Sequence, residues 1–265
     1  MGSKLPLRFV ALGYLTLLLG IPVGLVLYRT FQHGIGPPLD SLTSSDGAHA
    51  FWLTLEIAAI AVVVNTIFGV AMALLLVRRR FPGKWFLNGL VDLPFAVSPV
   101  VVGLALLLVY GRTGWFGGWL ADNGIRVIFS TPGMVLATIF VSLPFVVRET
   151  VPVLQEIGTE QEEAASTLGA SGWQTFWRVT LPAIRWGVGY GVVLTTARAL
   201  GEFGAVSVVS GRLVGQTETL TLRVQNEFER FDLTGAYAAS ALLAVMAIAV
   251  LLVMTALERR RSRAT

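Results

Sequence analysis

Long apolar runs are the feature that most constrains the fold of this chain. Five of them carry no charged residue, and a sixth is interrupted only by Arg198 and Glu202. A transmembrane helix needs about 20 predominantly apolar residues to cross a bilayer. In chain order, the runs are about 9–28, 57–77, 93–110, 127–147, 186–211 and 233–257. The sequence therefore predicts an all-α integral membrane protein with six transmembrane helices, in which residues 1–265 form a single membrane domain.

The composition supports a membrane protein. Hydrophobic residues make up 54% of the chain and charged residues only 14%, whereas soluble domains are about 25% charged. The first run is too long for a signal peptide and no small-residue cleavage site follows it, so we expect it to remain as a helix. The absence of Cys excludes disulfides, Cys-ligated zinc and thiol catalysis.

Basic residues at the ends of the runs predict the orientation. Cytoplasmic loops carry an excess of Lys and Arg. One side has thirteen basic residues: Lys4, Arg8, Arg78, Arg79, Arg80, Lys84, Arg148, Arg178, Arg185, Arg259, Arg260, Arg261 and Arg263. The other side has six: Arg29, Arg112, Arg126, Arg212, Arg223 and Arg230. Both termini are therefore predicted to be cytoplasmic, and the net charge of +4 reflects membrane orientation and not nucleic-acid binding.

The polar stretch 159–182, between the fourth and fifth runs, predicts a helix-turn-helix elbow. Thr159 and Glu162 have capping-box spacing, so a short helix should begin near Glu160, and Gly169 suits its C-terminal end. Ser171 and Gln174 repeat the capping-box spacing and predict a second short helix, with Pro182 following it.

The same stretch carries a family resemblance. EAASTLGASGWQTFWRVTLP has Glu-Ala-Ala, three residues, a Gly, nine residues and then Val-x-Leu-Pro, which resembles the cytoplasmic EAA loop of ABC importer permeases. Val179 stands where the family usually has Ile. The resemblance implies a type I ABC importer permease fold and an elbow that docks in a groove of the ATPase subunit. The implied ATPase-coupling residues are Glu162, Glu163, Ala164, Ala165, Gly169, Leu181 and Pro182. The alternative is an ordinary amphipathic connector.

The third and fifth runs extend the resemblance to a subfamily. DLPFAVSPVVVG, which contains Pro94, Ser98 and Pro99, resembles the bent third-helix region of sulfate and molybdate permeases. RALGEFGAVSVVSG resembles the W-type permease subunit of the bacterial sulfate and thiosulfate importer. The candidate translocation path consists of Pro94, Ser98 and Pro99 in the third run and Arg198 and Glu202 in the fifth. Charges within a span are costly unless paired or hydrated, so the pair either neutralises itself between helices or presents Arg198 to an oxyanion.

Other polar positions leave two interpretations open. Asn65 in the second run should contact another helix, with a substrate contact as the alternative. Asp92 is either an interfacial carboxylate or part of the path. The outer residues 29–52 are expected to be irregular, with His33 and His49 solvated. Leu220, Val224, Phe228 and Phe231 recur at helical spacing, which predicts an outer amphipathic helix that lies on the membrane or meets a binding protein.

No motif in the chain supplies energy or catalysis. It has no P-loop, no H-E-x-x-H and no Cys/His cluster, so it is not an enzyme by itself and no metal or cofactor site is expected in it. The resemblance places ATP and Mg on a partner ATPase dimer. It also implies a second permease of the T-type and an extracytoplasmic sulfate-binding protein, in the bacterial inner membrane. Molybdate or tungstate import is the alternative cargo. An ATPase-independent secondary transporter is the alternative class, but it predicts inverted repeats that the sequence does not show.

Overall fold

The computed structural model describes residues 5–261, and every regular element within that range is helical. The all-α prediction is confirmed. Lys4 and Arg263, two of the basic residues used for the orientation, lie outside the described residues.

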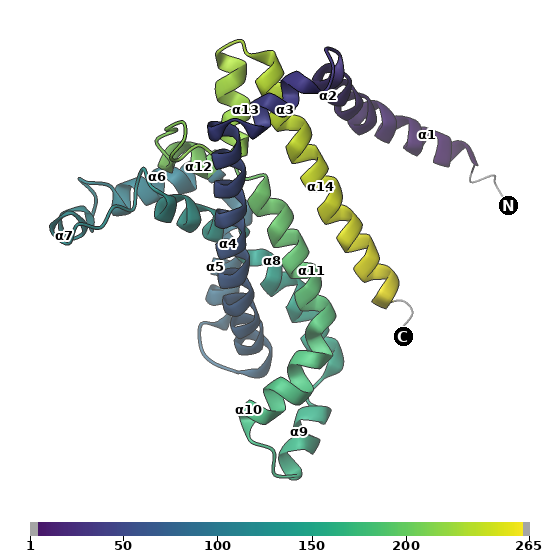
Figure 1. Ribbon diagram of the computed structural model, residues 1–265. Coiled ribbons are helices and arrows are strands. Elements are labelled where there is room, and N and C mark those ends of the chain that lie inside the picture. The colour runs from purple at the N-terminus through teal and green to yellow at the C-terminus, as the bar shows by residue number, and fades with distance from the viewer. Residues whose placement is uncertain (1–4, 262–265) are drawn as a thin grey trace.

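Three long helices form the centre of the molecule (Figure 1): α4 (Ser45–Arg78), α8 (Thr131–Ile157) and α11 (Leu181–Leu200). Glycines let them approach closely. A Cβ at Gly191 of α11 would lie 2.6 Å from Val146 Cα of α8, and one at Gly69 of α4 would lie 2.6 Å from Val146 Cβ. A Cβ at Gly187 of α11 would likewise lie 2.7 Å from Glu149 O of α8. Val146 is fully buried between two glycines.

A buried amide adds a polar contact to this centre. Asn65 of α4 is fully buried, and its Nδ2 donates to Ser142 Oγ at 2.9 Å and to Ile139 O at 3.1 Å, both on α8. Interhelical hydrogen bonds of this kind are worth about 0.6 kcal/mol on average in membranes. The structure supports the packing interpretation of Asn65.

Two of the predicted spans are broken. The third consists of α5 (Lys84–Ala96) and α6 (Pro99–Tyr110), and the chain bends by 112° between them. Pro99 suits the first turn of α6, where a backbone N–H has no intrahelical partner. The fifth, predicted as one helix over 186–211, is instead α11 followed by the short α12 (Gly204–Val209). That single-helix prediction is wrong.

The peripheral helices complete the membrane elements. The N-terminal helix is continuous from α1 (Leu5–Leu15) through a π-helical segment (Thr16–Gly20) to α2 (Ile21–Phe31), and it extends away from the centre (Figure 1). α14 (Leu233–Arg261) lies beside α11. Within residues 5–261, four single helices are long and apolar enough to span a membrane, or five elements if the bent α5–α6 pair counts as one. With the 20-residue α11, the described helices are roughly consistent with six spans.

Several boundaries differ from the prediction. The outer segment 29–52 is largely helical, because α3 (Gly36–Thr43) lies within it and α4 already begins at Ser45, capped by Ser44 Oγ accepting from Gly47 N. α8 runs ten residues past the predicted end of the fourth span, through Pro144 and Pro152. The outer loop 111–131 contains the short α7 (Gly117–Asp122).

The predicted amphipathic helix is present as α13 (Leu220–Glu229), and two of its charged residues are buried. Phe228 is 61% exposed and Phe231 is 89% exposed, whereas Arg223 and Glu227 are buried. Arg223 pairs with Glu218 at 3.5 Å and with Glu227 at 3.2 Å. An internal ion-pair cluster therefore determines which face of α13 points inward.

Candidate coupling elbow and translocation path

The elbow is built from two short helices at the end of the molecule opposite α13 (Figure 1). α9 (Glu160–Thr167) ends at Gly169, whose φ is +83°. Gly169 N donates to Ser166 O and Ala170 N donates to Ala165 O, both at 3.0 Å. These two bonds are the Schellman pattern, and the left-handed residue that it needs is glycine. The predicted stop at Gly169 is confirmed.

The second half of the elbow leads directly into the membrane. Ser171 and Gln174 form the predicted capping box at the start of α10 (Gly172–Thr175). A π-helical turn (Phe176–Thr180) then joins α10 to α11. Pro182 lies in the first turn of α11, so it follows the elbow helix as predicted without interrupting the chain's helical path.

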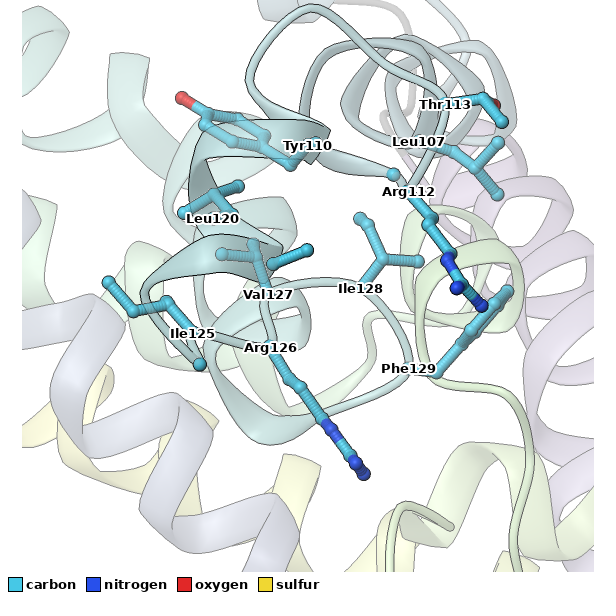
Figure 2. A pocket seen from close by; sticks show the side chains of 14 residues that line it. Leu107, Tyr110, Arg112, Thr113, Leu120, Ile125, Arg126, Val127, Ile128 and Phe129 are labelled. Carbon is cyan, nitrogen blue, oxygen red and sulfur yellow. The ribbon is translucent and has the colours of Figure 1, made fainter.

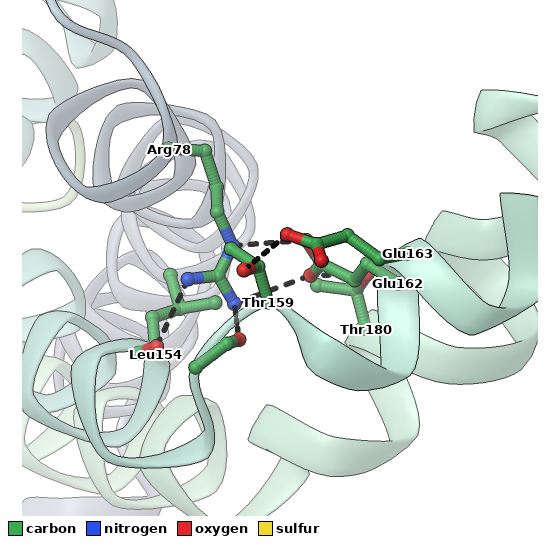
Figure 3. Close-up of polar contacts among 7 residues, drawn as sticks. Arg78, Leu154, Thr159, Glu162, Glu163 and Thr180 are labelled. Atoms are coloured by element: carbon green, nitrogen blue, oxygen red, sulfur yellow. Dashed lines mark hydrogen bonds and ion pairs between the residues drawn. The ribbon is translucent and has the colours of Figure 1, made fainter.

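The predicted capping box at the start of α9 is not formed. Thr159 Oγ1 donates to Glu163 Oε1 at 2.6 Å, and the Thr159 side chain caps no backbone N–H. Glu162 instead turns inward to Arg78 at the end of α4, with Arg78 Nε donating to Glu162 Oε2 at 2.9 Å (Figure 3). Thr180 Oγ1 donates to the other oxygen, Oε1, at 2.9 Å. A tertiary ion pair thus replaces the local cap.

Of the predicted coupling residues, three meet at one groove. Ala164 and Ala165 of α9 and Pro182 of α11 line an open groove of about 640 Å³, beside Leu168 and Val179. Glu163 is also on the exposed surface of α9, but the half-buried Glu162 turns toward Arg78 and Leu181 packs against a buried core cluster. Exposed apolar side chains border this region, with Leu168 89% and Trp173 70% exposed.

In the candidate path, Arg198 and Glu202 form the predicted pair. Arg198 Nη2 lies 2.7 Å from Glu202 Oε2. Glu202 stands in the break after α11, and its other oxygen accepts from Ala205 N at 2.7 Å, which caps the start of α12. The cavity beside Glu202 is only about 10 Å³, space for about one water molecule. Glu202 therefore serves as counterion and cap, while the Arg198 side chain remains 30% exposed.

The break in the third span lies beside the break in the fifth. A Cβ at Gly204 would meet Pro99 Cβ at 2.9 Å, and one at Gly103 would meet Ala205 O at 2.8 Å. Ser98 is the residue before α6, while Pro94 is buried within α5. The structure thus brings Pro99 and the segment after Glu202 together, and it leaves Pro94 one turn away inside its helix.

A separate cavity lies at the C-terminal end of α6. It has a volume of about 750 Å³ and is lined by Leu107, Tyr110, Leu120 and Ile125 among others, with Arg112 and Arg126 at its edge (Figure 2). None of the predicted path residues lines it. The cavity is formed by the end of α6 and the loop 111–131, and not by the candidate path.

Sequence analysis missed the polar partners of the predicted residues. Arg78, Thr180 and Arg148 each make a specific contact, the last donating from Nε to Asp92 Oδ1 at 2.6 Å. The last pair joins α8 to α5 and supports a structural role for Asp92. In the sequence, Arg78 and Arg148 are recognisable only as orientation signals, because nothing in the local sequence pairs a residue with another more than fifty positions away.

The described residues form an all-helical membrane protein with two broken spans and an exposed elbow, the arrangement expected of a transport permease. The family model described as binding-protein-dependent transport system inner membrane component matches residues 65–263. The chain belongs to this family, and it is a membrane component of an ABC transport system that is not catalytic by itself.

Individual relatives agree with the family. The sulfate transport system permease protein CysW of Synechococcus elongatus is 51% identical over 98% of this chain and 92% of its own length. The sulfate transport system permease protein CysT of Escherichia coli is 38% identical over 94% and 89%. A bacterial alginate ABC transporter, solved in complex with an alginate pentasaccharide-bound periplasmic protein, has the same fold, with a TM-score of 0.78, 18% identity and coverage of 96% and 93%.

Proposed function

We propose that this chain is the W-type permease subunit of an ATP-driven importer that moves sulfate and thiosulfate across the inner membrane by alternating access. The observation that carries the proposal is the 51% identity with a CysW protein over 98% of the chain, against 38% with a CysT protein. The same contrast favours a T-type chain as the second permease, in place of a second copy.

The other subunits follow from the residues of the elbow. Ala164, Ala165 and Pro182 line an open groove, and Leu168 and Trp173 leave apolar surface uncovered beside it. We assign this surface to a cytosolic ATPase dimer that carries ATP and Mg. The excess of basic residues on the elbow side supports cytoplasmic termini, and a periplasmic binding protein would deliver the anion at the opposite face.

In this mechanism ATP acts by favouring one state of the complex. ATP closes the ATPase dimer, the elbow transmits that movement, and the membrane helices open outward. A ligand shifts such an equilibrium only through its different affinity for the two states. Arg198, with Glu202 as its counterion, is the group that we assign to lowering the barrier for the anion, close to the break at Ser98 and Pro99. Pro94 borders that break from within α5.

Uptake of radiolabelled sulfate by cells with and without this chain tests the proposal. We expect deletion to abolish uptake, and thiosulfate to compete at much lower excess than molybdate. Lost molybdate accumulation with unchanged sulfate uptake would instead identify a molybdate or tungstate permease. Sulfate uptake that persists after removal of the ATPase subunit but requires this chain would indicate a secondary transporter.

A further inference from the structure

Arg78 stands at the junction of the elbow with the membrane helices. It is the last residue of α4, and its side chain is only 15% exposed. Its guanidinium donates to both oxygens of Glu162, at 2.9 Å and 3.3 Å. It also donates to Leu154 O at 3.1 Å and to Gly158 O at 2.6 Å. One side chain therefore ties the ends of α4 and α8 to α9 (Figure 3).

Glu162 extends this connection to the fifth span. Besides Arg78, it accepts from Thr180 Oγ1 at 2.9 Å, and Thr180 is the last residue of the π-helical turn before α11. π-Helical turns place side chains where a regular α-helix would not, and they are frequent at functional sites. We name Arg78, Glu162 and Thr180 the polar clamp.

α9 depends on such a connection because it has little else to hold it. It has only eight residues, none of which is buried. Isolated helices shorter than about 12–15 residues are marginal in water, and most helix stability in proteins comes from packing of an apolar face. The residues of α9 have no buried apolar face, so its direction depends on the connecting turns and on the clamp.

We propose that Arg78 is a positioning residue for energy coupling, which transmits the displacement of α9 to α4, α8 and α11 together. The inference rests on the proposed coupling role of the elbow. Without the clamp, α9 can swing about Gly158 and Gly169 while the membrane helices stay still. Arginine is required because a planar guanidinium can bind a carboxylate with two donors and still reach two carbonyls, whereas the lysine ammonium is a single point of charge.

The test uses the complete complex, reconstituted in liposomes with its ATPase, second permease and binding protein. The measured quantity is the amount of sulfate transported per ATP hydrolysed. We expect Arg78→Gln and Arg78→Lys to lower this ratio by about tenfold, within the usual range of coupling between sites, while ATP hydrolysis continues. The matched control is Arg79→Gln, because Arg79 is the next residue and is exposed. An Arg78→Gln ratio equal to that of Arg79→Gln would overturn the proposal.

Two further measurements separate this proposal from its alternatives. If Arg78 acts through Glu162, the double variant Arg78→Gln/Glu162→Gln will lose no more coupling than the worse single variant; fully additive losses would refute the clamp. Amide hydrogen exchange over residues 160–167 needs no substrate, and we expect Arg78→Gln but not Arg79→Gln to accelerate it. Unchanged exchange would refute the positioning role even if the transported anion were not sulfate.

Discussion

The contact between α11 and α8 at Gly191 predicts a specific loss of stability. In Gly191→Ala, the new Cβ would lie 2.6 Å from Val146 Cα, a backbone atom that cannot rotate away, while ordinary contact begins near 3.4 Å. The two helices must therefore separate by about 0.8 Å at this point. Overpacking of this kind costs about 1–3 kcal/mol. Alanine in a helix recovers about 0.5–1 kcal/mol relative to glycine, so we expect a net loss of up to about 2.5 kcal/mol.

Gly189 on the same helix provides the matched control. A Cβ there would meet only Leu257 Cδ1, at 4.0 Å, so Gly189→Ala should keep the helix gain without the overpacking. The difference between the two variants then isolates the contact, at about 1–3 kcal/mol. The assay is unfolding of the purified permease in mixed micelles with increasing dodecyl sulfate, followed by tryptophan fluorescence. Equal midpoints for the two variants would refute close packing of α11 on α8.

Three further predictions concern other positions. Asn65→Ala should lower stability in the same assay by about 1 kcal/mol, because it removes two bonds to α8; an unchanged midpoint would argue against them. Gly169→Asp and Glu163→Lys should uncouple ATP hydrolysis from uptake without affecting membrane insertion, since the first forces a side chain into a left-handed position and the second reverses the charge of the exposed elbow face. Gly172→Asp is the control for the glycine, because both sites are open but only Gly169 has a positive φ. Normal uptake by the first two variants would count against the elbow assignment. Arg198→Ala should abolish anion uptake in an assembled complex, and retained uptake would exclude Arg198 from the path.

Local chemistry made much of the fold predictable. The apolar runs identified the membrane elements, and Gly169, with its left-handed backbone, ended α9 where expected. Pro94 and Pro99 predicted a bend in the third span, although only the structure gives its angle of 112°. Each of these features depends on residues that are close together in the sequence.

The features that sequence analysis missed depend on tertiary contacts. The break after α11 is stabilised by the Ala205 N bond to Glu202 and by Thr221 Oγ1 donating to Glu202 O at 2.8 Å, and the second of these comes from nineteen positions away. The apolar spacing of residues 220–231 predicted the helix α13, but not the burial of Arg223, whose charge Glu218 and Glu227 neutralise. Hydrophobic periodicity cannot register a buried ion pair.

Arg198 and Glu202, the charged pair of the fifth span, have different roles at the break that follows α11. A helix that ends inside a membrane leaves backbone groups that need polar partners. Glu202 meets that need by accepting from Ala205 N, and at the same time it balances Arg198. Because its carboxylate is 2% exposed and already engaged on both oxygens, it is not available to a transported ion. The Arg198 side chain, in contrast, is 30% exposed. It lies next to the segment that packs on Pro99. In the proposed path, an anion that approaches the break would therefore reach the arginine without displacing the carboxylate, and the paired charge would let the site attract a divalent anion and still release it.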